Sequence, residues 1–541
     1  MKQELSNEQK AYLDKFPGQF FLVPTAKEII ILPNGEKVHK MSISMTLGSK
    51  IIDTARLNAG DITNPKKLLA AFGEKNLLPY IDESVFENIF RQYGKLLEFT
   101  QCTIIYAATG WINENEYILC DKKVSADVIE TVMTRDKSSN FVLASQDQAA
   151  KFVTDIIFNI FDNRAYAQIV ILYIIISIIS AKLPQGVGAF SSLLCLIGST
   201  DSRKTSVANA LFNPMGANSH NASFEDTLAS VEASLRSCKD SILVLDDLSH
   251  DTAQQRRILE QVLRLVGDKT TCAKKMSGGG KIIEEQPTAT AVVTGEFVPL
   301  LTNSSLARLI ILELSQNSVN LEELTKLQEQ PALLSSFFTY FIQWFLRKPE
   351  LISELTIEQQ STRNRLLKEQ RFWHPRCAST VAWFSAMTKV VADFIRLPFS
   401  PLEIEAAVAE VLKEAHKNYG EQEALSIYLD TLSNMIVSNE LIVSKDLMSG
   451  DSIKKNDGFI VFSNDAIFEK IKKKAQASGH QLDIAAPKLY KQLFEKGLLV
   501  KYGKSSTTSL KYRDGVQRRC MRLSIDSIKK YLKEVEINVD F

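Results

Sequence analysis

Cysteine and histidine are scarce and scattered in this chain. Its 541 residues include seven cysteines and six histidines, with no Cys-x-x-Cys pair and no paired histidine spacing. This pattern predicts neither a disulfide framework nor a cysteine- or histidine-based metal site. The first ten residues lack the apolar core of a signal peptide, so we expect a cytoplasmic protein.

An excess of charge of either sign is also missing. The 64 Lys and Arg against 63 Asp and Glu leave a net charge of +1. With 45% hydrophobic and 23% charged residues, the composition excludes collagen-like, coiled-coil and wholly disordered chains. At roughly 150 residues per domain, the length predicts three or four folded domains.

Long apolar runs are rare as well. Residues 165–181 carry no charged side chain, and this run stands at the lower length limit for crossing a bilayer. Gln168, Ser177 and Ser180 interrupt it, and a helix that is apolar all round also suits the centre of a large domain. We therefore predict a buried core helix and no membrane contact, with a membrane span as the alternative.

The order of apolar runs and turn residues predicts an α/β fold in four segments. The first mixes a helix with strand-like runs at 20–23, 28–32, 103–107 and 117–119. The second alternates helices with short apolar strands, as in a parallel α/β sheet. The third is helical, with the charged stretch 347–369 as a connector or a solvated helix. The predicted domain ranges are 1–145, 146–315, 316–440 and 441–541.

The sharpest local motif is an apolar strand that runs into a loop and a helix. It has the Gly-x-x-x-x-x-Lys-Thr spacing of a P-loop, whose backbone N–H groups cradle phosphates at a helix N-terminus. Lys204 would bind the β- and γ-phosphates of ATP, and Thr205 would bind Mg²⁺. The predicted cofactor-binding residues are Gly198, Ser199, Thr200, Asp201, Ser202, Arg203, Lys204 and Thr205.

One P-loop position departs from the usual pattern. Arg203 stands where a second glycine is common, and if the loop needs a positive φ there, arginine is strained. A coincidental match or a site that binds ATP without hydrolysing it is the alternative.

Further motifs follow in the order expected of an ATPase. The apolar run 241–245 ends in Asp246 and Asp247, which we expect to hold Mg²⁺ and to orient or deprotonate the attacking water, respectively. Thr294 lies at the end of the next apolar strand, where we expect a residue that senses the γ-phosphate. Arg308 follows, where an oligomeric ATPase places the finger that reaches a neighbour's nucleotide. The alternatives are a helix-capping aspartate and a surface ion-pair arginine.

These motifs resemble those of the self-loading, MCM-like AAA+ replicative helicases of mobile genetic elements, of the cassette chromosome and pathogenicity island type. The resemblance rests on 193–208, Val244-Leu245-Asp246-Asp247 and Val293-Thr294-Gly295-Glu296. Gly110-Trp111-Ile112 with Tyr117-Ile118-Leu119 resembles the opening strands of that family's domain of formerly unknown function, DUF927. The resemblance covers roughly residues 100–541 and implies ATP-driven, hexameric translocation on DNA.

A glycine- and lysine-rich stretch, 269–282, lies between the acidic strand and the sensor strand. We predict a hairpin in a central pore, where Lys274, Lys275 and Lys281 bind DNA phosphates. A mobile, solvated loop is the alternative.

The last hundred residues contain most of the basic excess. Residues 470–530 carry sixteen Lys and Arg against four Asp and Glu, and their order predicts a winged helix with strands at 498–502 and 518–523. The alternative is a protein-contact module. The predicted DNA-facing residues are Lys488, Tyr490, Lys491 and Gln492 toward a groove and Lys501, Lys504, Lys511 and Arg513 toward backbone phosphates.

Together these patterns predict an ATP- and Mg²⁺-dependent DNA helicase or translocase. It would bind single- and double-stranded DNA, assemble as a homo-oligomer, most simply a hexamer, and meet other replication proteins. The rival interpretation is a nucleotide-regulated DNA-binding or scaffold protein with little or no ATP turnover.

Overall fold

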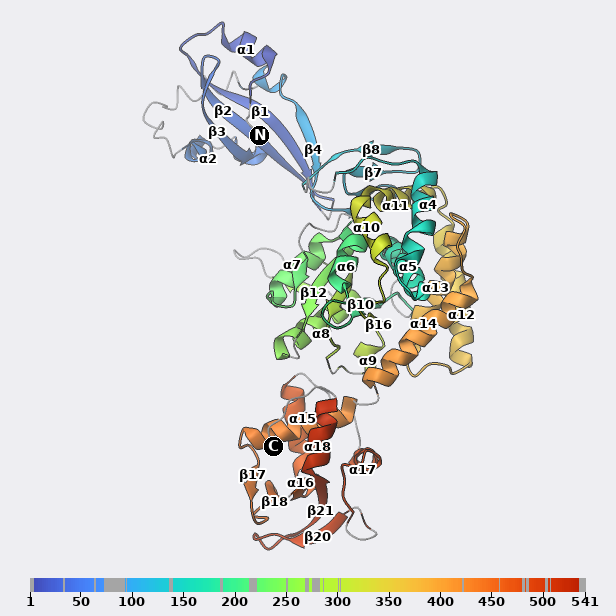
Figure 1. Ribbon diagram of the computed structural model, residues 1–541. Coiled ribbons are helices and arrows are strands. Elements are labelled where there is room, and N and C mark those ends of the chain that lie inside the picture. Colours follow the sequence, from blue (N-terminus) through green and yellow to red (C-terminus); the bar gives the residue numbers. More distant parts are fainter. Residues whose placement is uncertain are drawn as a thin grey trace.

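A computed structural model shows an N-terminal unit, a central unit and a C-terminal unit that follow one another (Figure 1). It describes residues 4–32, 35–62, 65–72, 93, 95–135, 140–184, 188–213, 221–249, 252–267, 272–274, 283–285, 287–299, 301, 303–420, 423–456, 458–478, 482, 486–501, 505 and 507–534.

The N-terminal unit is built on a five-stranded sheet in the order β3-β2-β1-β4-β9. The sequence predicts two separate strands, at 20–23 and 28–32, but the structure has one continuous strand, β1, over both runs. The strand continues past Pro24 because a register shift between Pro24 and Ala26 accommodates the missing N–H. The elements are α1 (Asn7–Leu13), β1 (Phe20–Ile31), β2 (Lys37–Leu47), β3 (Lys50–Asn58), η1 (Ala59–Asp61), α2 (Pro65–Ala71), β4 (Cys102–Tyr106) and β9 (Met133–Thr134).

A small antiparallel sheet between β4 and β9 packs onto the central unit. The Trp111 indole N–H donates to the Ile178 carbonyl at 2.9 Å, and the Tyr117 hydroxyl donates to the Asp240 carbonyl at 2.6 Å. Both rings belong to the main core, so this core extends across the expected 145/146 boundary. The strands are β5 (Gly110–Trp111), β6 (Tyr117–Leu119), β7 (Lys122–Val124) and β8 (Ile129–Thr131).

The central sheet is parallel, with the strand order β11-β12-β15-β10-β16. Alternate strand residues face two different cores, as expected of a sheet covered by helices on both sides. The strands are β10 (Leu193–Ile197), β11 (Ala222–Ser223), β12 (Ile242–Leu248), β15 (Thr290–Gly295) and β16 (Leu309–Glu313). The helices of this part are α4 (Gln146–Asp155), η5 (Ile157–Asn159), α5 (Arg164–Ile179), η6 (Ser180–Lys182), α6 (Lys204–Phe212), α7 (Leu228–Ser237), α8 (Ala253–Gly267) and α9 (Asn303–Leu306).

Helix α5 contains the long apolar run. Every residue from Ile169 to Ile179 is buried, and the Tyr173 hydroxyl donates to the carbonyl of Ala291 in β15 at 2.7 Å. By length and composition, 164–182 is the one helix among the described residues that could cross a membrane. In this fold it lies in the main core instead, as predicted.

Helices from the third segment complete the same core, which therefore also crosses the expected 315/316 boundary. The stretch 347–369 contains the whole of one of these helices, α12, whose Leu351, Leu355 and Leu366 are buried. The helices are α10 (Leu321–Glu329), α11 (Pro331–Leu346), α12 (Leu351–Lys368), α13 (Pro375–Ala392), α14 (Pro401–Ala415) and η8 (His416–Gly420).

The C-terminal unit has its own core, which begins at α15. Its sheet order is β17-β18-β19-β21-β20. Of the strand expected at 498–502, the described part forms a single antiparallel bridge, Leu499 to Leu523, with the Val500 N–H donating to the Arg522 carbonyl at 2.8 Å. The longer partner of β21 is β20. The elements are α15 (Glu423–Val437), β17 (Ile442–Ser444), β18 (Ser452–Asn456), β19 (Phe459–Phe462), α16 (Asn464–Ala477), α17 (Ala486–Glu495), β20 (Thr507–Lys511), β21 (Gln517–Ser524) and α18 (Ile525–Glu534).

Candidate functional site

The loop between β10 and α6 contains the residues of the P-loop motif. A Cβ added to Gly198 would lie 2.1 Å from the Leu314 carbonyl oxygen and 2.6 Å from the Ser202 hydroxyl oxygen. Only glycine fits this position without displacing the backbone. The loop thus turns tightly at the carboxyl end of β10 and enters α6 at Lys204.

The position occupied by Arg203 has the positive φ that the motif suggests. Arg203 is the N-cap of α6 with φ 61° and ψ 18°, and its side chain makes no capping hydrogen bond. Asp201 also has a positive φ, 70°. The fold therefore imposes a glycine-like conformation on an arginine, which predicts local strain but not a different path of the loop.

Three predicted residues meet at the carboxyl edge of the sheet. The Thr205 hydroxyl donates to Asp246 Oδ1 at 2.9 Å, and the Thr294 hydroxyl donates to the same oxygen. The backbone N–H of Asp247 lies 3.4 Å from Thr294 Oγ1. Since β15 lies between β10 and β12, the parallel order places Thr294 between the loop and the acidic strand.

The donor atoms of this cluster suit a small hard cation. A threonine hydroxyl and an aspartate carboxylate are oxygen ligands of the kind that Mg²⁺ takes together with phosphate oxygens. Among the described residues there is no group of three or more His, Cys, Asp or Glu placed to hold a metal. Thr205 and Asp246 therefore fit a magnesium ion that phosphate oxygens or water also hold.

A carboxylate that the sequence interpretation left without a role lies beside Lys204. Glu296 Oε1 accepts a hydrogen bond from the Thr200 hydroxyl at 2.7 Å and lies 4.0 Å from Lys204 Nζ. Lys204 Nζ also donates to the Ser199 carbonyl at 3.1 Å. The sequence offered one indication of this contact, the position of Glu296 two residues after Thr294.

The structure places Arg308 apart from this cluster. Its carbonyl accepts a hydrogen bond from the N–H of Leu193 at 2.7 Å, so Arg308 lies where β10 and β16 begin, at the amino edge of the sheet. The residue is 6% exposed, and its guanidinium donates to the Ser304 carbonyl at 3.4 Å. Burial, together with the nearby charges of Arg376 and Arg308, lowers the pKa of His374.

Of the predicted pore lysines, the structure describes one, and only in its backbone. Lys274 ends β13 (Cys272–Lys274), which pairs antiparallel with β14 (Ile283–Glu285). Lys275 and Lys281 lie outside the described residues. The two flanking strands form a hairpin, as predicted, while the lysine-rich tip remains a prediction.

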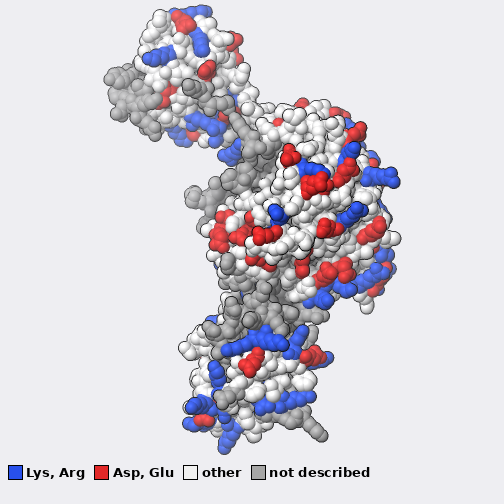
Figure 2. All heavy atoms as spheres, in the orientation of Figure 1, with Lys and Arg blue, Asp and Glu red and all other residues white. Residues whose placement is uncertain are grey.

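The predicted DNA-facing residues of the C-terminal unit have mixed surroundings. Lys491 is exposed, 3.7 Å from Glu495, and Arg513 pairs with Asp446. Figure 2 shows basic side chains gathered on the visible face of this unit, whereas both signs mix on the central unit. Lys501 and Lys511 are exposed, Tyr490 and Gln492 are half-buried, and Lys504 and the side chain of Lys488 lie outside the described part.

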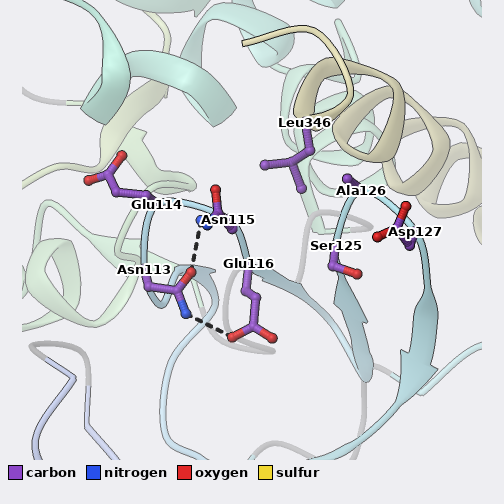
Figure 3. A pocket seen from close by; sticks show the side chains of 8 residues that line it. All are labelled: Asn113, Glu114, Asn115, Glu116, Ser125, Ala126, Asp127 and Leu346. Atoms are coloured by element: carbon purple, nitrogen blue, oxygen red, sulfur yellow. Dashed lines mark hydrogen bonds between the residues drawn. The ribbon is translucent and has the colours of Figure 1, made fainter.

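A cavity of about 630 Å³ lies between two hairpin tips of the small sheet and the end of α11. In Figure 3 the Asn113 side chain bonds to Glu116 and to the backbone of Asn115, closing one wall. None of the predicted site residues lines this cavity. Its lining residues are Asn113, Glu114, Asn115, Glu116, Ser125, Ala126, Asp127 and Leu346.

Comparison with known proteins gives structural similarity at low sequence identity. No family model and no curated protein matches the chain, and nothing in the comparisons matches the DUF927-like domain. The chain is similar to the active helicase Cch of SCCmec type IV, with 14% identity, TM-score 0.49, and 96% of this chain and 95% of that chain covered. It is also similar to the A-form apo structure of the NrS-1 C-terminal region, with 11% identity, TM-score 0.32, and coverage of 92% and 96%. A third similar structure, JCV helicase, has 15% identity, TM-score 0.25, and coverage of 42% and 66%.

Proposed function

We propose that this protein is an ATP-dependent DNA helicase or translocase with an AAA+-type P-loop core. The observation that supports it best is the meeting of Thr205, Asp246 and Thr294 beside the loop that begins at Gly198. A tight loop at a helix N-terminus, a lysine and a hydroxyl–carboxylate pair are what a magnesium nucleotide requires. The motifs' resemblance to mobile-element replicative helicases favours DNA as the substrate and replication of such an element as the setting.

Each side chain would have a distinct task in hydrolysis. Lys204 would bind the β- and γ-phosphates, and Thr205 and Asp246 would hold Mg²⁺, which neutralises developing charge on the phosphates. Thr294 donates to Asp246 and accepts from the N–H of Asp247. It would therefore fix the positions of the two aspartates relative to each other. Asp247 would orient or deprotonate the attacking water.

The remaining parts of the proposal concern DNA and assembly. The C-terminal unit would be a winged helix, with α17 as the groove-reading helix and the β20–β21 hairpin as the wing. The loop beyond Lys274 would contact DNA phosphates in the pore of a homo-oligomer, most simply a hexamer. Arg308 would act on the nucleotide of a neighbouring copy.

An ATPase assay with and without single-stranded DNA tests the central claim. Phosphate release by the wild type should rise when DNA is added, and Lys204→Ala should abolish it because the phosphates lose their cation. Asp247→Asn should still bind ATP and fail to hydrolyse it, since an amide cannot accept the water proton. Phosphate release by Lys204→Ala at the wild-type rate would contradict the assignment of the P-loop.

A second candidate function rests on Arg203. Arg203 has a left-handed conformation where the loop enters α6. If this strain or the guanidinium prevents hydrolysis, the protein would be a nucleotide-regulated DNA-binding or scaffold protein. Such a protein would bind ATP tightly and release no phosphate with or without DNA. The same assay therefore separates the two candidates.

A further inference from the structure

Glu296 contacts two residues of the proposed phosphate-binding loop. The register of β10 against β15 pairs Ile197 with Gly295, so the next residue, Glu296, extends alongside the loop. Its carboxylate accepts from the Thr200 hydroxyl at 2.7 Å and lies 4.0 Å from Lys204 Nζ. Among the described residues, it is the one carboxylate within 4.0 Å of Lys204.

The backbone under Glu296 is held tightly. The Glu296 N–H donates to the Leu248 carbonyl at 2.9 Å, and a Cβ at Gly295 would lie 2.6 Å from Leu248 Cβ. The end of β15 is therefore fixed against the end of the acidic strand β12. The Glu296 side chain, 43% exposed, can move while its backbone stays in place.

The contacts of Glu296 are those that a phosphate group would take. Phosphate oxygens and carboxylate oxygens are both anionic acceptors, and a lysine ammonium and a threonine hydroxyl serve either. If ATP binds here as proposed, its γ-phosphate and the Glu296 carboxylate compete for Lys204. A carboxylate left beside the γ-phosphate would also repel it.

We infer that the Glu296 carboxylate is an internal stand-in for the γ-phosphate. It contacts Lys204 and Thr200 while no nucleotide is bound, and its side chain must rotate away when a triphosphate enters. This inference rests on the proposed nucleotide site and deepens it. ADP, which lacks the γ-phosphate, displaces Glu296 less completely. Glu296 therefore sets how strongly the site prefers a triphosphate over a diphosphate.

Glu296→Gln tests this role, because the amide keeps the shape and the hydrogen bond from Thr200 but loses the charge. We expect the Kd of a non-hydrolysable ATP analogue to fall by roughly tenfold, the effect of losing one partly screened charge contact. The Kd of ADP should fall by about threefold or less.

Glu313→Gln is the matched control. Glu313 ends the neighbouring strand β16 and is exposed, but its carboxylate accepts from Asn418 and Tyr419, each at 3.0 Å, instead of from the loop. Its nucleotide affinities should equal those of the wild type. All variants are measured by equilibrium titration after thermal unfolding shows that they are folded.

The outcomes separate this inference from the proposed function. Failure of the folded wild type to bind either nucleotide overturns the proposed function and this inference with it. Binding by the wild type with an unchanged Kd in Glu296→Gln overturns the inference alone. Loss of hydrolysis in that variant at unchanged affinity also overturns it, since Glu296 would then act on the attacking water.

Discussion

At the scale of single residues, unusual backbone conformations gather around the candidate site. Asp201, Arg203 and Asp247 have φ values of 70°, 61° and 69°, in the left-handed region where a residue with a Cβ costs about 1–2 kcal/mol. Such conformations persist where surrounding contacts fix them. Here the close approach of Gly198 to Leu314 and the hydrogen bonds around Asp246 supply those contacts.

The strain at Arg203 can be measured by comparing two substitutions. Glycine adopts the left-handed conformation freely, whereas alanine retains the Cβ that opposes it. We expect Arg203→Gly to have a free energy of unfolding about 1 kcal/mol higher than Arg203→Ala. Because both variants lose the same guanidinium, the difference reports on the backbone alone.

Denaturant unfolding followed by tryptophan fluorescence suits this comparison. All four tryptophans, Trp111, Trp344, Trp373 and Trp383, lie in or pack against the main core. Equal stabilities of the two variants would contradict a left-handed conformation at this position.

Spacing along the chain predicts that Lys204, Thr205, Asp246 and Thr294 belong to one site, because each lies near the end of a strand or in the first turn of a helix. The contact between Glu296 and the loop depends instead on the register between β10 and β15. The burial of Arg308 depends on the packing of Gly267, where an added Cβ would lie 2.9 Å from the Arg308 side chain. Neither dependence is visible in a local motif.

At the scale of elements, a short buried apolar run predicts a strand correctly in one place and incorrectly in another. The strand at 117–119 matches β6 because all three of its residues are buried and apolar or aromatic. The run 498–502 begins with the buried Leu498 and Leu499, yet these side chains pack into the C-terminal core without a strand forming. The polar strand β20 is set by its turn, where the Tyr512 N–H bonds to the Val516 carbonyl.

The proposed winged helix predicts how DNA affinity responds to salt. Replacing Lys491, Lys501 and Lys511 with alanine should lower the slope of log affinity against log salt by about 0.9 for each lysine that contacts a phosphate. Replacing Lys10, Lys15 and Lys50, exposed lysines of the N-terminal unit, removes the same charge and should leave the slope nearly unchanged. Fluorescence anisotropy with duplex DNA over a salt series measures both slopes. Equal slopes for the wild type and both triple variants would indicate that the C-terminal unit contacts a partner protein instead of DNA.

At the scale of the whole molecule, the two halves of the proposed catalytic machinery lie on opposite edges of one sheet. Lys204 follows the carboxyl end of β10, and Arg308 lies at its amino end, about 16 Å away along a five-residue strand. In this proposal Arg308 therefore would not act on the P-loop of its own chain. A complete site in this proposal needs a second copy.

Mixing two inactive variants tests this sharing. We expect Arg308→Ala to bind nucleotide nearly as well as the wild type and to hydrolyse it up to about 10³-fold more slowly, by analogy with other trans-acting fingers. Adding Lys204→Ala should restore part of the activity, since one copy then supplies the arginine and its neighbour the P-loop. Mixed oligomers without recovery at any ratio would count against a shared site. Because Arg308 is buried, its variant needs a thermal unfolding curve before the mixing experiment.

The burial of α5 also affects how the chain is made. Its isoleucine-rich surface is covered partly by α14, which contributes Leu412 to the same core. At about 5–20 residues per second of synthesis, α5 emerges from the ribosome on the order of ten seconds or more before that cover exists. During this interval the nascent chain exposes α5 to water and to other nascent chains. We therefore expect the yield of folded protein to depend on translation speed and on chaperones that shield α5, and not only on the stability of the finished fold.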